Sequence, residues 1–394
     1  MRTCSLACLL LAPLAACAAN ALPPPPKNVF ATTTIIAGRA EGTARELRQK
    51  GDNAILAQNW QDAVDAYEAL IAGDKVSSDD PAVIFSLATA YEGIGAREKA
   101  RERYREVNRR WPAEPNARSA VVRETSLDAY LEDWAALGAL GEQVLGKMEP
   151  DAAEKMLGYG ARGLSRALAG DEARATKDIN AGLEIMDETR FGMTGQLPVA
   201  GAMLKFALGE LRKLKSEKVS LNPPGSDFVL KLETRCAFLL EAQQAYADAI
   251  RSSDPYWAAM SGYRVGELYS RLHGDLMQIP STDRAKTESD RQVFYGIMHV
   301  RYRVLLEKGV EMMDRTLALG DRTGAAPVWM DRAKASKAEM QRALATEKQV
   351  LSTYLFTEAE LEKALVLLKA KAEKDAAKSS KSASSASVPV AKKK

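Results

Sequence analysis

The chain has 394 residues, with 55 Lys or Arg and 52 Asp or Glu, so its formal net charge is only +3. This near balance argues against a nucleic-acid partner, which would need a strongly basic surface. The length suffices for two domains or one long solenoid, and an aromatic content of 6% beside abundant Ala and Leu favours an all-α chain.

A secretory signal is predicted at residues 1–16. Arg2 supplies a positive start, and the apolar run after it is far shorter than the roughly 20 residues that span a bilayer. The run ends in Leu14-Ala15-Ala16-Cys17, which resembles the lipobox of bacterial lipoproteins. In that family the peptidase cuts before the Cys, and the thiol carries a diacylglyceryl group. An ordinary signal cut elsewhere in the Ala-rich stretch, such as after Ala19, is the alternative.

The lipobox resemblance implies that Cys17 is acylated, for example with palmitate, and no other cofactor is expected. One acyl chain binds a membrane marginally, whereas two or more hold stably, so a fully acylated Cys17 suffices as an anchor. By the sorting rule of Gram-negative lipoproteins, the non-acidic Ala18 favours the outer membrane. The protein is therefore expected to face the periplasm, and surface exposure stays open.

The other cysteines leave no disulfide. Cys4 and Cys8 are lost with the signal, so only Cys236 remains beside the lipidated Cys17 in the mature chain. Cys236 lies in an apolar helical pattern, which favours a buried and inert thiol.

A tether is predicted at residues 17–38, directly after the signal. It contains Pro23-Pro24-Pro25-Pro26, and consecutive prolines favour an extended polyproline II segment. The folded part is therefore expected to stand off the membrane on a proline-rich spacer.

Helical repeats are predicted at residues 39–195. Small and aromatic residues recur at fixed offsets: Gly51, Ala54, Ala63 and Tyr67, then Ala88, Tyr91, Ala100, Tyr104 and Pro112. This pattern resembles the tetratricopeptide repeat, a pair of antiparallel helices whose small residues let the backbones approach. Matched to that motif, the repeats start near Ala44, Pro81, Arg118 and Met156, which are 37, 37 and 38 residues apart.

A partner-binding groove is expected on the first helix of each pair, because stacked pairs line a concave face with those helices. The groove is mixed but rather apolar and suits a helix or an extended peptide. Its predicted members are Arg48, Asp52, Ile55, Leu56, Phe85, Thr89, Glu92, Val122, Tyr130, Leu164 and Leu168. Packing against the neighbouring repeat is the alternative role for the apolar ones.

Arg97, Arg101, Arg105 and Arg109 recur every four residues in the second repeat. Either they dock an acidic partner, or they pair with Glu98, Glu102 and Glu106 on a solvated helix face. The second interpretation is favoured, since a Glu stands three residues before each of the last three Arg.

A less regular region of helical hairpins is predicted at residues 196–375. Helices are expected at about 197–218, 227–251, 255–278, 283–319 and 327–351, with a loop from Gly320 to Ala326. Thr357 and Glu360 form a predicted capping box, followed by a buried stripe of Leu361, Ala364, Leu365 and Leu368. Residues 376–394 form a predicted disordered tail of Lys, Ser and Ala, for which a peptidoglycan ligand is the alternative to a solubilising role.

Catalysis is not expected. The two histidines, His273 and His299, are 26 residues apart and have no Cys or carboxylate at metal-ligand spacing, so no metal site is expected. The contrasting hypothesis is a helical enzyme of peptidoglycan metabolism. It predicts a polar cleft with paired carboxylates or one of the two histidines.

Two further resemblances concern function. Arg109-Arg110-Trp111-Pro112 is similar to the inter-repeat turn of tetratricopeptide lipoproteins in outer-membrane assembly complexes, a resemblance that covers about residues 44–190. The segments Tyr263–Tyr269, Ile279-Pro280, Leu306–Val310 and Val328-Trp329 resemble repeat lipoproteins of myxobacteria, some of which serve gliding motility. They imply a scaffold that docks envelope proteins, in motility or trafficking first and in β-barrel assembly second.

Overall fold

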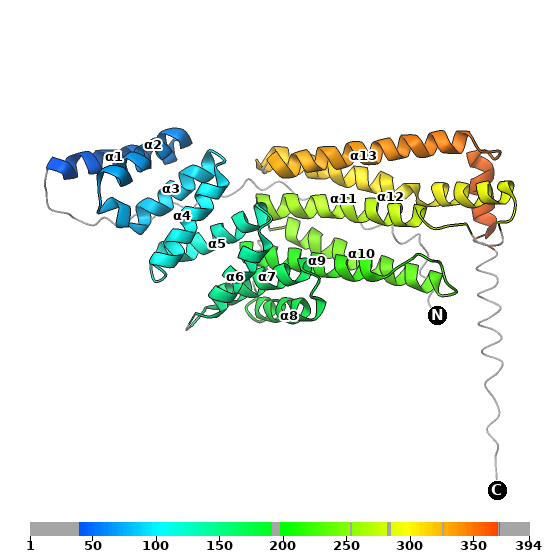
Figure 1. Ribbon diagram of the computed structural model, residues 1–394, viewed down its shortest axis with the longest axis horizontal. Coiled ribbons are helices and arrows are strands. Elements are labelled where there is room, and N and C mark those ends of the chain that lie inside the picture. Colours follow the sequence, from blue (N-terminus) through cyan, green and yellow to red (C-terminus); the bar gives the residue numbers. More distant parts are fainter. Residues whose placement is uncertain are drawn as a thin grey trace, which may run out of the picture. The chain divides into compact units, whose positions relative to one another are not determined.

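A computed structural model describes residues 39–147, 149–190, 198–252, 254–281, 285–324, 327–368 and 370. Within these residues the secondary structure is helical and contains no β-strand (Figure 1). The predicted all-α class is therefore confirmed. The predicted signal, Cys17, the tether and the tail lie outside the described residues.

Four helix pairs make up the first half of the chain, as the repeat pattern predicts. Neighbouring helices of this series pack on one another along the sequence. The pairs are α1 (Arg39–Leu56) with α2 (Trp60–Gly73), α3 (Pro81–Gly93) with α4 (Arg97–Arg110), α5 (Pro115–Tyr130) with α6 (Trp134–Leu145), and α7 (Ala152–Leu168) with α8 (Glu172–Glu188).

The turn inside each pair has the same backbone geometry. A residue with a positive φ stands at Gln58, Gly95, Glu132 and Gly170, so successive turns are 37, 37 and 38 residues apart. The next residue donates its backbone N–H to the carbonyl five residues earlier, over 2.8 or 2.9 Å in all four turns. This is the Schellman closure of a helix end. Its recurrence at one period confirms a regular repeat of helix pairs, the architecture that the tetratricopeptide-like pattern predicts.

Small residues and one aromatic ring fill the centre of each of the first two pairs. A Cβ on Gly51 would lie 2.8–2.9 Å from the ring of Tyr67, so the ring occupies the space that a side chain would take. Ala63, Ala100 and Tyr104 are fully buried. Pairs that cannot bury an apolar face alone are stabilised by stacking on the next pair, which explains the continuous core.

The third pair departs from the pattern. Helix α6 packs more extensively on α7 than on its own partner α5. Glycines permit this approach, since a Cβ on Gly141 would lie 2.8 Å from the carbonyl oxygen of Gly158 and 2.9 Å from the backbone nitrogen of Arg162. Two backbones therefore touch at this crossing.

Longer helices make up the second half of the chain. They are α9 (Val199–Lys218), α10 (Phe228–Ile250), α11 (Pro255–Met277), α12 (Glu288–Thr323) and α13 (Pro327–Ser352), followed by helix 358–368. All the predicted helices are confirmed, but the loop predicted at 320–326 is wrong at its start. Helix α12 continues through Gly320, where Met330 fills the space of a side chain, and ends at Gly324 with a φ of 64°.

The last helix begins as predicted. Thr357 donates its backbone N–H to Glu360 at 2.8 Å, and Glu360 returns its own to the Thr357 hydroxyl at 3.3 Å. Leu361 and Leu365 are buried, whereas Leu368 is exposed, so the predicted stripe is wrong at its final position. In the described part of the chain, every helix is too short or too polar to cross a membrane.

Contacts divide the chain into two compact units. Unit 1 contains residues up to Lys215 together with Leu240–Ser261, and unit 2 contains Ser216–Leu239 together with the residues from Gly262 onward. Unit 1 thus includes α1–α8, most of α9, the end of α10 and the start of α11. In unit 1, Phe206 packs on Tyr246 and Trp257, and in unit 2, Trp329 packs on Tyr263.

Candidate functional site

The predicted groove residues of the first pair lie on α1 and remain partly open. Arg48 donates to the Asp80 carboxylate at 2.7 Å and keeps 42% of its side chain exposed. Asp52 accepts a hydrogen bond from the hydroxyl of Tyr67, and Ile55 packs partly on the core. Leu56, the last residue of α1, is 76% exposed.

The predicted groove residues of the second pair lie on α3, and each contacts Tyr104 of α4. Phe85 packs edge-on against Tyr104 with 5.3 Å between ring centres, and the Thr89 hydroxyl lies 3.2 Å from that of Tyr104. Glu92 accepts from Tyr104 at 3.1 Å and from Arg123 at 3.4 Å. Burial, and next the charge of Glu92, raise the pKa of Tyr104 well above its usual range, so its hydroxyl stays a donor.

Tyr256, at the start of α11 in unit 1, covers part of the predicted groove. Its hydroxyl donates to Glu92 at 3.2 Å, and its ring meets that of Tyr130 at 5.7 Å. On Tyr130, the Arg97 guanidinium lies 4.3 Å from the ring centre. Glu92 and Tyr130, two of the predicted groove residues, therefore both contact Tyr256 of their own chain. Sequence reasoning missed Tyr256, because no local pattern links residues 164 positions apart.

The remaining groove residues belong to the third and fourth pairs. Val122 and Leu168 are half-buried. Leu164 has no exposed surface and belongs to the core, so its prediction as a contact residue is wrong. The close approach of Gly163 on the same helix to Ile179 brings α7 and α8 together there and leaves no space beside it.

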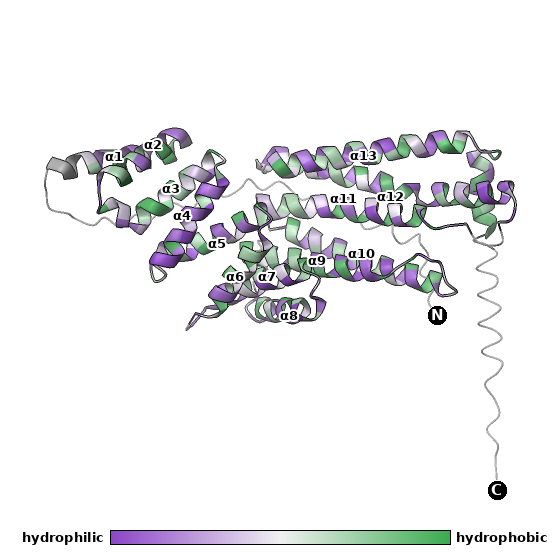
Figure 2. Ribbon diagram, in the orientation of Figure 1, coloured by the Kyte–Doolittle hydropathy of each residue, from purple (hydrophilic) through white to green (hydrophobic). Residues whose placement is uncertain are grey.

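In the arginine stripe of α4, Arg101 and Arg105 face α5, whereas Arg109 is exposed. Although α4 is mainly hydrophilic (Figure 2), Arg105 donates to Glu124 at 2.8 Å, and Arg101 pairs with Asp128 at 3.4 Å and with Asp133 at 3.1 Å. The favoured i,i+3 pairing is corrected, since of the three expected pairs only Glu102 with Arg105 forms, at 3.6 Å. The stripe joins the second pair to the third.

Two carboxylates share these arginines within the α4–α5 interface. Asp128 is fully buried and Glu124 nearly so, and one oxygen of each has no hydrogen-bond partner. Burial first, and then the charge of Glu124, raise the pKa of Asp128 to about 7 against the opposing Arg105 and Arg101. Burial likewise raises the pKa of Glu124. The interface therefore holds a proton near neutral pH.

Replacing Asp128 with Asn is expected to flatten the dependence of stability on pH. The folded chain binds the Asp128 proton below about pH 7, whereas the unfolded chain releases it down to about pH 4, so wild-type stability rises as the pH falls through this window. Above pH 7, Asp128→Asn should be more stable than wild type by roughly 1–3 kcal/mol, and the difference should shrink toward pH 4. Urea unfolding at pH 5 and pH 8 measures this, and an equal difference at both values would contradict it.

The two histidines meet at one carboxylate in unit 2. His273 Nε2 lies 2.6 Å, and His299 Nδ1 lies 3.1 Å, from the same oxygen of Glu347. Burial opposes ionisation of Glu347, but the hydrogen bonds from His273 and His299 outweigh it and lower its pKa to about 2. Their 26-residue separation in the sequence gave no sign that the two histidines share one carboxylate. His273 and Glu347 are buried, and the cluster ties α11, α12 and α13 together.

Few of the described side chains are arranged as a metal, nucleophile or small-molecule site would require. Among the described residues, no group of three or more His, Cys, Asp and Glu side chains could hold a metal ion. Cys236 is half-buried, and burial raises the pKa of its thiol, as expected for an inert cysteine. Two polar pockets lie in unit 2, and neither is lined by the histidines or by Glu347.

No family model matches the chain, and no curated protein matches it in sequence. Among solved structures, a tetratricopeptide repeat protein from Parabacteroides merdae is 11% identical, with a TM-score of 0.38, over 74% of this chain and 99% of that one. The P58(IPK) TPR domain is 14% identical, with a TM-score of 0.15, over 78% of this chain and 99% of that one. The repeat assignment stands on the turn geometry of the chain itself.

Proposed function

We propose that this protein is a helical-repeat scaffold that docks protein partners on the first helices of unit 1. The observation that carries the proposal is the open surface of α1. Leu56 is 76% exposed, and Arg48 stands half-exposed two turns before it on the same helix. An exposed apolar side chain beside polar ones suits a helix or an extended peptide, which is the usual ligand of such grooves.

The docking surface is proposed to centre on the first pair. Glu92 and Tyr130 contact Tyr256, and Leu164 lies in the core, so these later positions offer less to a partner. Arg48, Asp52, Ile55 and Leu56 keep the exposure that contact needs.

Replacing Leu56 with Asp is expected to release the partner without unfolding the chain, because the side chain is already in solvent. The measurement compares the envelope proteins that co-purify with each variant after mild cross-linking. The matched control is Glu98→Lys, a charge change at an exposed position of α4, a second helix. The proposal predicts a discrete set of proteins that is lost from Leu56→Asp and kept by Glu98→Lys. Equal recovery with both variants, or recovery of no such set by the wild type, would contradict it.

The scaffold is further proposed to lie at the outer membrane, anchored through lipid on Cys17 and facing the periplasm. This rests on the lipobox resemblance and on Ala18. The basic tail is proposed to touch acidic peptidoglycan, since eight Lys stand against two acidic residues in 369–394. Any such attraction would weaken with salt.

A gliding-motility or trafficking complex is the first proposal for the assembly served, and β-barrel assembly is the second. Both derive from sequence resemblance. Three of the four segments resembling the myxobacterial lipoproteins lie on α11, α12 and α13, where Gly309 meets Met340 and Trp329 is fully buried, and Ile279-Pro280 follows the end of α11. The resemblance therefore concerns how unit 2 packs, and it supports a shared fold more than a shared partner.

A further inference from the structure

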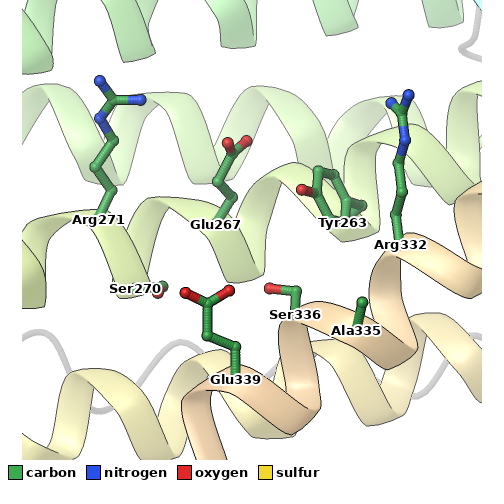
Figure 3. Close-up of a pocket in the computed structure, with 8 residues that line it drawn as sticks. All are labelled: Tyr263, Glu267, Ser270, Arg271, Arg332, Ala335, Ser336 and Glu339. Atoms are coloured by element: carbon green, nitrogen blue, oxygen red, sulfur yellow. The ribbon is translucent and has the colours of Figure 1, made fainter. Parts of the chain in front are cut away.

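A polar groove runs between α11 and α13 in unit 2 (Figure 3). Its volume is about 310 Å³, and its lining includes Glu267 and Arg271 from α11 and Arg332 and Glu339 from α13. Ser270, Ala335 and Ser336 also line it, so small side chains stand between the charged ones. A groove with small residues at its base lets an incoming chain approach closely. This groove is called the α11–α13 groove below.

The charges of the α11–α13 groove follow an order. Figure 3 shows Glu267 and Glu339 between Arg271 at one end and Arg332 at the other. Along α11, Tyr263 and Arg271 are eight residues apart, which corresponds to about 12 Å of helix. The groove thus presents a negative centre and two positive ends over the length of a short peptide segment.

Only one of the two central carboxylates is neutralised within the chain. Glu339 is exposed and forms no ion pair with any described residue, whereas Glu267 pairs with Arg264 at 2.7 Å. At the ends, Arg271 pairs with Glu217 at 3.3 Å, and Arg332 lies 4.6 Å from the ring centre of Trp329. The carboxylate of Glu339 is therefore the group with most to gain from a cationic partner.

We propose that the α11–α13 groove is a second partner site, which receives a Lys or Arg side chain from a peptide segment that carries acidic residues on either side. The central cation would lie between Glu339 and Glu267, and the flanking carboxylates would face Arg271 and Arg332. Arginine is suited to such contacts because its guanidinium is planar and weakly hydrated. The site is independent of the docking surface proposed on unit 1.

Three fluorescent nine-residue peptides in an alanine background test this on the full chain. They carry acid–base–acid, base–acid–base or base–base–base residues at positions 2, 5 and 8. The acid–base–acid peptide should bind most tightly, and its affinity should fall as salt is raised. Equal affinity for the three peptides, tightest binding of the all-basic one, or no binding at millimolar peptide would overturn the proposal. Tightest binding of the all-basic peptide would instead point to the chain's own Lys-rich tail.

Variants locate the contact. Glu339→Gln should weaken the acid–base–acid peptide by at least about tenfold, a loss of 1.4 kcal/mol. Glu233→Gln, an exposed carboxylate of the same unit on α10, should leave the affinity unchanged. Glu339→Lys should weaken the acid–base–acid peptide further than Glu339→Gln does, because the central cation of the peptide then meets a like charge. Unchanged binding by Glu339→Gln, or an equal loss in Glu233→Gln, would overturn the assignment.

Discussion

Replacing Gly141 with Ala is expected to lower the free energy of unfolding of unit 1 by about 2–3 kcal/mol. The added Cβ would lie 2.8 Å from the Gly158 carbonyl oxygen and 2.9 Å from the Arg162 backbone nitrogen. Backbone atoms cannot rotate away as a side chain can, so α6 and α7 must separate. Urea unfolding followed by tryptophan fluorescence measures this loss of free energy. Unit 1 contains four tryptophans that respond to its unfolding: Trp60, Trp111, Trp134 and Trp257.

The matched control is Gly73→Ala, in the same unit. Nothing lies within 4 Å of a Cβ at Gly73, the last residue of α2. The change should leave stability unaltered or raise it by up to about 1 kcal/mol, because Ala favours the helix over Gly. If Gly141→Ala behaved like Gly73→Ala, the contact of the α6 and α7 backbones would be refuted.

Replacing Cys17 with Ala is expected to abolish acylation and to move the protein from the membrane fraction to the soluble one. Stable anchoring needs two or more acyl chains, and no described helix could replace them. Incorporation of labelled palmitate is the primary measurement, with fractionation as the second. Cys236→Ala is the control and should keep both the label and the membrane location. Label retained by Cys17→Ala, or wild-type protein found in the soluble fraction, would contradict the anchor.

The repeats could be predicted from the sequence because their cause is local. A small residue, a helix end and an aromatic ring recur at one period, and each acts within about forty residues. The turns at Gln58, Gly95, Glu132 and Gly170 reproduce that period in their dihedral angles. Two of the four turn positions, Gln58 and Glu132, carry no glycine, so residue type alone does not mark the positive φ there.

The exposure of the predicted groove residues agrees with the sequence pattern only where a single helix pair determines it. Leu56 is exposed as expected, because it ends the first helix of the series. Tyr256 donates a hydrogen bond to Glu92 although the two residues are 164 positions apart, and no sequence periodicity predicts such a contact. The burial of Leu164 depends on how closely α7 approaches its neighbouring helices. Glycines such as Gly163 determine that distance, and the hydrophobic pattern of the sequence does not.

The predicted pairing of the α4 arginines with glutamates of the same helix was wrong because it also depends on contacts between helices. Pairs three residues apart are visible in a sequence, whereas pairs between helices depend on register. Arg105 therefore forms its shortest ion pair with Glu124 of α5. The cluster of His273, His299 and Glu347 arose in the same way, from three helices whose sequence segments show no shared spacing.

The central claim is that a protein partner contacts the first helix of unit 1, and photo-cross-linking in intact cells tests it most directly. A photoreactive residue is placed at position 56 of α1 in one variant and at position 98 of α4 in another, both exposed in the free chain. We expect a discrete cross-linked product from position 56, recovered with the membranes, and none from position 98. The same product from both positions, or none from position 56, would contradict it.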